Sequence, residues 1–230
     1  MSDTPRFVGQ SNAYDIPNNI IYLGSLEYAW DVGDSLVGWT LGGTTVPTIA
    51  VDGRMRLYDN INAADQSSSA YITIPNTLGK LFMILHVKFT RMIDDTSTDD
   101  YALYFSLNLS GASTGIAHRY RPGVSNYLVY ADSTGLGNLV SFAFVPVAGQ
   151  EYALDVVVSP SEVILFIDNV RRASVPLSSK GSSQMSNHPR QQFLSYNKRA
   201  FFWVRHDAGE VSHYRLRDIR VSEYRGKNHM

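Results

Sequence analysis

Residues 152–176 read YALDVVV-SPS-EVILFIDN-VRRASVP, and this stretch decides the fold class. Three segments rich in β-branched and large apolar residues are separated by a Ser-Pro turn and an Asp-Asn turn, the pattern of an antiparallel meander. Val156–Val158 and Ile164–Ile167 are apolar at consecutive positions. We therefore expect these strands in the middle of a layered sheet, with both faces covered.

Strand-like segments recur along the rest of the chain, and nearly every gap between them contains Gly, Pro, Asn, Asp or Ser. The expected strands are 20–23, 36–41, 48–51, 54–58, 70–74, 81–90, 101–109, 127–131, 139–145, 152–158, 163–168, 170–175, 200–205 and 211–223. About fourteen short strands in one chain predict an all-β, two-sheet antiparallel jelly-roll sandwich. Arg54–Tyr58 and Lys88–Thr90 alternate polar and apolar residues, so each should have one solvent-facing side.

The expected domain organisation is one jelly-roll domain over residues 20–224. Pro5, Gly9 and Pro17 interrupt residues 1–19, which are expected to form an N-terminal arm. Residues 225–230 form a short C-terminal tail.

Composition excludes several classes of protein. The chain is 44% hydrophobic and 18% charged with a net charge of −1, which is typical of a globular protein and unlike a disordered chain. It has no cysteine, which excludes disulfides, thiolate metal sites and thiol catalysis. No basic stripe suggests nucleic acid, and no apolar run is long enough to span a membrane. The N-terminus lacks the features of a signal peptide, so we expect synthesis and retention in a cytosol.

Charge is unevenly divided along the chain. Residues 1–100 carry 12 acidic and 6 basic side chains, whereas residues 101–230 carry 9 and 14. Either both halves interleave in one sandwich and the gradient disappears in space, or faces of opposite sign help identical copies pack head to tail.

Several segments resemble the concanavalin A-like (laminin G-like) jelly-roll superfamily, and together they cover roughly residues 25–224. These segments are Gly38–Gly43 with Trp39, Val51–Tyr58, Ala70–Ile74, Leu165–Arg171 with its Asp-Asn turn, and the closing Val211–Tyr224. The resemblance implies the same fold. That superfamily includes lectins, glycan-binding modules, glycoside hydrolases, adhesion domains and virion components, so the fold alone does not choose a function.

Catalysis is not expected. A retaining glycosidase needs two carboxylates about 5–5.5 Å apart, and the hydrolases of this superfamily carry them as Glu-x-Asp-x-x-Glu or a close variant. The chain has no such run: Glu27 and Asp31 are separated by Trp30, and apolar residues fill the strand between Glu162 and Asp168.

Metal sites are represented only by an acidic segment. Asp94, Asp95, Asp99 and Asp100 supply the oxygen ligands that calcium prefers, but they lack the Asp-x-Asp-x-Asp-Gly frame of an ordered calcium loop, so a solvated hairpin tip is the alternative. The histidines lack the short spacing that anchors a zinc pair. We expect no cofactor.

Tyrosines are the remaining signal. Tyr120, Arg121, Asn126, Tyr127 and Tyr130 combine aromatic rings with polar groups, which suits a glycan or a protein partner; the alternative is that they line the edges of the sandwich. Residues 201–203 (Phe-Phe-Trp) are expected to be core strand.

The functional hypothesis is a non-catalytic structural or interaction protein of a virion, most specifically a bacteriophage capsid decoration or tail-associated protein made in the host cytoplasm. Its partners would be the protein subunits of a larger assembly, including copies of itself contacted through the arm and the tail, with no nucleic acid or membrane. The alternative from another class is a carbohydrate-binding, lectin-like module, and a glycoside hydrolase on the same fold is the third hypothesis.

Overall fold

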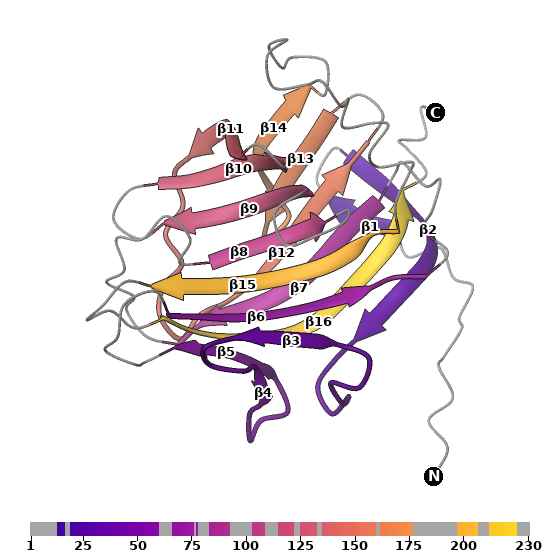
Figure 1. Cartoon of the computed structure of the whole chain (residues 1–230). Coiled ribbons are helices and arrows are strands. Elements are labelled where there is room, and N and C mark those ends of the chain that lie inside the picture. Colours follow the sequence, from indigo (N-terminus) through magenta and orange to yellow (C-terminus); the bar gives the residue numbers. More distant parts are fainter. Residues whose placement is uncertain are drawn as a thin grey trace.

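The chain forms a two-layered β-sandwich (Figure 1). The computed structural model describes residues 13–16, 19–59, 66–75, 77, 83–92, 103–108, 115–121, 125–132, 135–159, 162–176, 197–206 and 212–224. These residues form strands, turns and irregular segments without a helix, so none of them belongs to a helix that could cross a membrane.

Nine strands form one sheet, in the order β1-β2-β16-β7-β12-β13-β14, with β5 also paired to β16 and β4 to β5. The bounds are β1 Ala13–Ile16, β2 Asn19–Trp30, β4 Thr48–Ile49, β5 Met55–Asp59, β7 Met83–Arg91, β12 Glu151–Val158, β13 Glu162–Ile167, β14 Val170–Pro176 and β16 Ser212–Tyr224.

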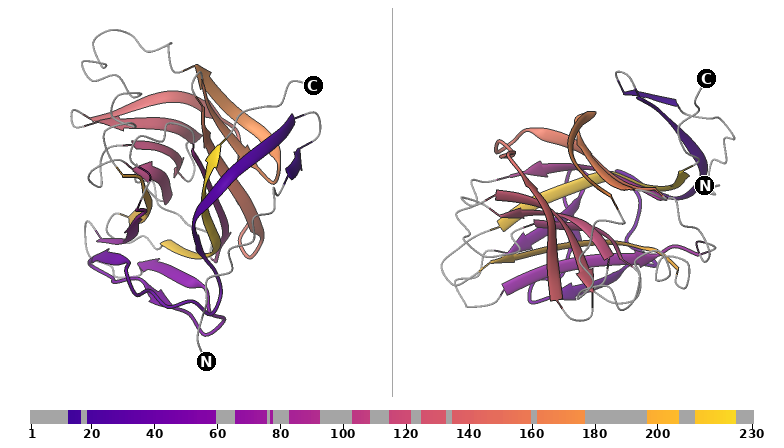
Figure 2. Two further views of the ribbon diagram at one scale, coloured as in Figure 1. Left: turned by 90° about the vertical axis from the view of Figure 1, so that its right-hand side faces the viewer. Right: turned by 90° about the horizontal axis from the view of Figure 1, so that it is seen from above.

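Seven strands form the second sheet, in the order β11-β10-β9-β8-β15-β6-β3. The bounds are β3 Thr40–Gly43, β6 Gln66–Thr73, β8 Leu103–Asn108, β9 Gly115–Arg121, β10 Ser125–Asp132, β11 Gly135–Phe142 and β15 Arg199–His206. All the described pairings in both sheets are antiparallel. The two layers are seen from other sides in Figure 2. The expected all-β, two-sheet antiparallel jelly roll is confirmed.

Alternation along the strands builds the core between the sheets. In β7, Leu85, Val87 and Phe89 are buried in the core, whereas His86 and Lys88 lie on the opposite side of the strand. The expected solvent-facing position of Lys88 is therefore confirmed. We call the side of each sheet that points away from the other sheet its outer face.

The central meander is confirmed, with β12 paired to β13 and β13 to β14. Asp168 and Asn169 have φ angles of 51° and 62°, as the two central residues of a type I′ turn require. The Asp168 side chain also accepts a hydrogen bond from the amide of Ala153 (2.8 Å), which ties the turn to β12.

Two strands were not expected from the sequence. β9 contains the polar pair His118 and Arg119 in its middle, which hides its strand pattern, and β1 lies inside the segment expected to be an arm, where it pairs with β2. The rest of the expected arm and the tail at 225–230 lie outside the described residues.

The long strand β16 joins several parts of the nine-stranded sheet. One edge pairs with β7, while the other pairs first with β5 and then with β2. The register shifts between Arg217 and Arg220, where Asp218 adopts a positive φ of 51°. This irregularity places Asp218 at the junction of β2, β7 and β16.

Candidate functional site

The predicted tyrosine group lies on the neighbouring strands β9 and β10. Tyr120 is 2% exposed and belongs to the core cluster, and the Arg91 guanidinium carbon lies 5.8 Å from its ring centroid. Asn126, its cross-strand neighbour, is also 2% exposed. These two side chains are therefore part of the interior.

Asn126 links three segments of that interior. Its amide nitrogen donates to the carbonyl oxygen of Phe144, and its amide oxygen lies 3.2 Å from Nε2 of His118. Burial lowers the pKa of His118 to about 4, so the ring is neutral at neutral pH. The cluster joins β9, β10 and the segment leading to β12.

The other predicted site residues are not described in the same detail. The backbones of Arg121, Tyr127 and Tyr130 lie in β9 and β10, but their side chains are outside the described part of the structure. The calcium candidates Asp94, Asp95, Asp99 and Asp100 also lie outside the described residues. Among the residues that are described, no group of three or more histidine, aspartate or glutamate side chains could hold a metal ion. A binding role for either set stays a prediction.

An aromatic strip lies on the outer face of the seven-stranded sheet. It consists of Tyr71 on β6 with Phe201 and Trp203 on β15, with ring centroids 6.4 Å (Tyr71 to Phe201) and 6.5 Å (Phe201 to Trp203) apart. Phe202, between the last two, points into the core. Phe201, on the opposite face, is also buried at 3% exposure, so the expectation of buried strand residues holds for Phe201 and Phe202, whereas Trp203 is half-buried.

Polar groups border the aromatic strip. The Arg199 guanidinium carbon lies 5.0 Å from the Tyr71 ring centroid, and Arg199 Nε donates to the hydroxyl of Thr73 (3.1 Å). At the other end, Ser69 is paired with Trp203 and with Gly42 of the edge strand β3. Tyr71 and Trp203 are half-buried, so parts of both rings face solvent beside hydroxyl and guanidinium groups.

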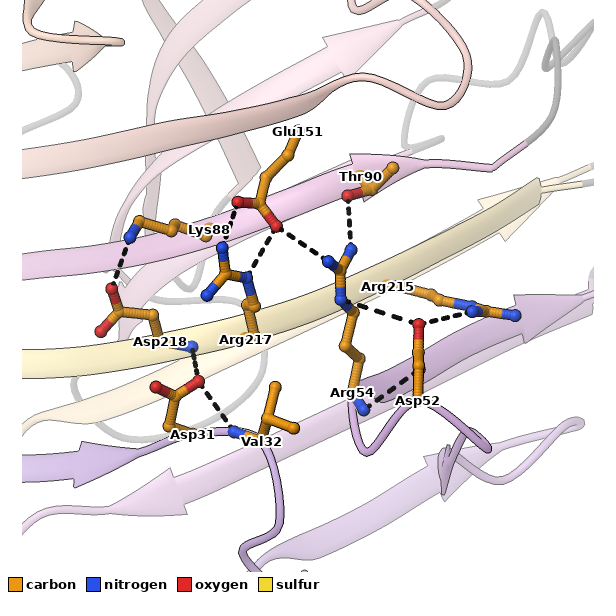
Figure 3. A network of polar contacts seen from close by, with 10 residues as sticks. All are labelled: Asp31, Val32, Asp52, Arg54, Lys88, Thr90, Glu151, Arg215, Arg217 and Asp218. Atoms are coloured by element: carbon orange, nitrogen blue, oxygen red, sulfur yellow. Dashed lines mark hydrogen bonds and ion pairs between the residues drawn. The ribbon is translucent and has the colours of Figure 1, made fainter.

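The outer face of the nine-stranded sheet carries a network of charged side chains (Figure 3). Glu151 on β12 accepts two hydrogen bonds from Arg217 (2.7 and 2.5 Å) and lies 3.4 Å from Arg54. Asp52 accepts a hydrogen bond from Arg215 (2.6 Å). The alternation of Arg54–Tyr58 indicated a solvent-facing side, but the partners of Arg54 include Glu151, which is distant in the sequence.

Asp218 forms the buried end of this network. Its carboxylate lies 3.0 Å from Lys88, 2.5 Å from Arg220 and 3.6 Å from His86, and its amide donates to the Asp31 side chain (3.1 Å). Figure 3 shows Lys88 and Asp31 approaching Asp218 from opposite sides. The three cations compensate the burial of the carboxylate.

Asp155 completes the environment of His86, with 2.7 Å between Asp155 Oδ1 and His86 Nδ1. Burial disfavours the charged ring, but the two carboxylates of Asp155 and Asp218 outweigh it and raise the pKa of His86 to about 9. His86 is therefore a cation at neutral pH.

The carboxylates of the network are held in their ionised form. Arg217 lowers the pKa of Glu151, and although burial opposes the shift, the cations around Asp52 and Asp218 lower the pKa of both carboxyls. A general acid for glycoside cleavage needs the opposite, a raised pKa. The network therefore has the properties of an ion-paired surface.

Comparison with solved structures places the chain in the concanavalin A-like jelly-roll fold, as the sequence resemblance indicated. The carbohydrate recognition domain of Emp47p has a TM-score of 0.63 at 11% identity, over 87% of this chain and 96% of that one. The Ca²⁺-bound exoplasmic/lumenal domain of VIP36 has a TM-score of 0.58 at 10% identity, over 86% and 91%. Alginate lyase A1-II′ has a TM-score of 0.54 at 12% identity, over 82% and 95%.

At these identities the likeness concerns the fold alone, and the similar structures include both lectin domains and an enzyme. No family model matches the chain, and no curated protein matches it.

Proposed function

We propose that this chain is a non-catalytic carbohydrate-binding module of the lectin type, and that the aromatic strip is its glycan-binding surface. The observation that carries the proposal is the position of Tyr71 and Trp203. Both are half-buried and lie on the outer face of a sheet that already has a full core on its other side, with the buried Phe201 between them.

The chemistry of the strip suits a sugar ring. Aromatic faces pack against the apolar C–H face of a pyranose, while hydroxyl and guanidinium groups at the border bond its hydroxyls. Arg199, Thr73 and Ser69 supply such groups next to Tyr71 and Trp203. The carbohydrate recognition domain among the similar structures supports this choice over an assembly role.

The test is a glycan-array screen of the full chain, followed by calorimetric titration of the best ligand. We expect Trp203→Ala to weaken binding about ten-fold or more, because stacking on an aromatic ring contributes about 1–3 kcal/mol in comparable ring-on-ring contacts. Trp203→Phe should retain most of the affinity.

Val145→Ala, at an exposed position away from the strip, is the control and should bind as the unaltered chain does. Unchanged binding by Trp203→Ala would exclude the aromatic strip as the site.

An assembly subunit, such as a virion component, is a second candidate with its own observation. Exposed aliphatic side chains lie between β2 and β5, among them Val32, Val37 and Val51. Val32 and the β4–β5 turn are in contact, since a Cβ at Gly53 would lie 2.7 Å from the Val32 side chain. Exposed apolar groups of this kind are typical of protein interfaces.

Light scattering tests the assembly role by comparing the full chain, a version without residues 1–19, and Val51→Asp. An oligomer that dissociates in either variant would support assembly. A monomer in all three would exclude self-association through these parts.

A further inference from the structure

A second cluster of polar side chains lies on the outer face of the nine-stranded sheet, where β5 pairs with β16. Arg56 is directly opposite Arg215, and Tyr58 is directly opposite His213. The Arg56 guanidinium carbon lies 3.9 Å from the centroid of the Tyr58 ring, and the ring of His213 meets the same tyrosine edge-on at 4.9 Å. We call these four residues the basic cluster.

Among the described residues, the cluster has more positive charge than its ion pairs neutralise. Two like charges directly opposite each other across antiparallel strands repel. Arg215 is paired with Asp52 at 2.6 Å. Arg56, in contrast, makes no ion pair or hydrogen bond from its side chain within the described part of the chain, and its guanidinium lies over the Tyr58 ring.

Three buried nitrogens of the cluster have no hydrogen-bond partner among the described residues: Nε of Arg56, Nε of Arg215 and Nε2 of His213. Buried polar atoms are normally paired, so the cluster is short of hydrogen-bond acceptors among the described residues. All four side chains are half-buried, which leaves the outer parts of the cluster open to solvent.

We propose that the basic cluster binds the carboxylate of an acidic saccharide, with Arg56 as the principal donor and Tyr58 holding its guanidinium in place. The planar guanidinium matches a carboxylate through two parallel N–H groups, as Arg217 already does with Glu151 on the same face. The bound carboxylate would also separate the charges of Arg56 and Arg215.

The neighbouring residues favour a single anionic group over a long polyanion such as nucleic acid. Asp52 and Glu151 lie beside the arginines of this face and would repel further phosphates. The carboxylate part of the proposal rests on the basic cluster alone, and the saccharide part rests on the proposed function.

The experiment is calorimetric titration of the full chain with tetragalacturonate, with a neutral tetrasaccharide and with sulfate, followed by Arg56→Gln. We expect tetragalacturonate to bind and Arg56→Gln to weaken its binding about ten-fold or more, the size expected for a charge-assisted pair. Arg172→Gln is the matched control, because Arg172 also lies over an aromatic ring, that of Phe144 at 5.7 Å, and carries the same charge. Its affinity should not change.

Thermal unfolding gives a second readout. Without ligand, Arg56→Gln should melt at the same or a higher temperature, because it removes the repulsion with Arg215, and it should lose the rise in melting temperature that tetragalacturonate gives the unaltered chain. A purely structural arginine would give the opposite, a lower melting temperature.

The outcomes separate this proposal from the aromatic strip. Tetragalacturonate binding that survives Trp203→Ala but not Arg56→Gln supports the basic cluster, whether or not the neutral tetrasaccharide binds. Binding that depends on Trp203 alone, or no binding of tetragalacturonate, overturns it. Binding of sulfate without tetragalacturonate overturns the saccharide assignment.

Discussion

The two outer faces of the sandwich differ in how their polar groups are satisfied. On the nine-stranded sheet, Asp218, Glu151 and Asp52 each accept from a cation of the same chain, and this network joins β7, β12, β16 and the turn between β4 and β5. On the seven-stranded sheet, Tyr71 and Trp203 present aromatic rings, with the guanidinium of Arg199 beside Tyr71. Paired groups of this kind stabilise the fold, whereas an aromatic surface, or a cation such as Arg56 that has no ion pair among the described residues, is available to a ligand.

Asp218→Asn tests whether the network stabilises the fold and has the largest expected effect. Asn tolerates the positive φ of this position, so the change removes mainly the charge that faces His86, Lys88 and Arg220. We expect a loss of about 3–5 kcal/mol in the free energy of unfolding, because a buried ionic group loses its partner. Chemical denaturation measures it, and a loss below about 1 kcal/mol would show that the network contributes little.

The pH dependence of stability distinguishes His86 from His118. The pKa of His86 is raised to about 9, so above pH 6.5 the folded state binds the extra proton, and stability should fall as pH rises towards 9. The pKa values of His118 and His213 are lowered to about 4, so the unfolded state binds more protons below pH 6.5, and stability should fall as pH decreases towards 4.

Denaturation curves between pH 4.5 and 9 check both effects, and His86→Gln should flatten only the alkaline fall. An unchanged alkaline fall in that variant would mean that His86 is not the responsible group.

Trp203→Ala tests whether the outer face of the seven-stranded sheet contributes to stability. If the aromatic strip serves binding, Trp203→Ala should lower the free energy of unfolding by about 1–2 kcal/mol, because the Trp203 ring is half-buried. Phe202→Ala, one position earlier and fully buried, should cost about 3–5 kcal/mol. Equal costs for the two substitutions would make Trp203 a structural residue.

Asp52→Asn has the smallest expected effect. The Asp52 side chain is 35% exposed, so solvent screens its pairs with Arg215 and Arg54. We expect a loss between zero and about 1 kcal/mol that shrinks further at high salt. A loss as large as that of Asp218→Asn would mean that the network acts as one cooperative unit.

The sequence by itself determined the fold class and most of the strands. Its β-rich segments are separated by turn residues, and the Asp168–Asn169 turn and the β12–β13–β14 meander are local features that chemistry close in the chain specifies. β9 could not be predicted in the same way. Its polar residue His118 is buried, and the side chain that His118 contacts there, Asn126, lies on another strand.

Only the tertiary structure decided which polar residues meet. Tyr120 and Asn126 looked like surface residues in the sequence, but the register of β9 and β10 turns both side chains inward. Glu151 and Arg217, or Arg56 and Arg215, are far apart in the chain and become neighbours through antiparallel pairing. Strand period fixes the side of a sheet on which a residue lies, but pairing across the sheet fixes its neighbours, and binding chemistry depends on those neighbours.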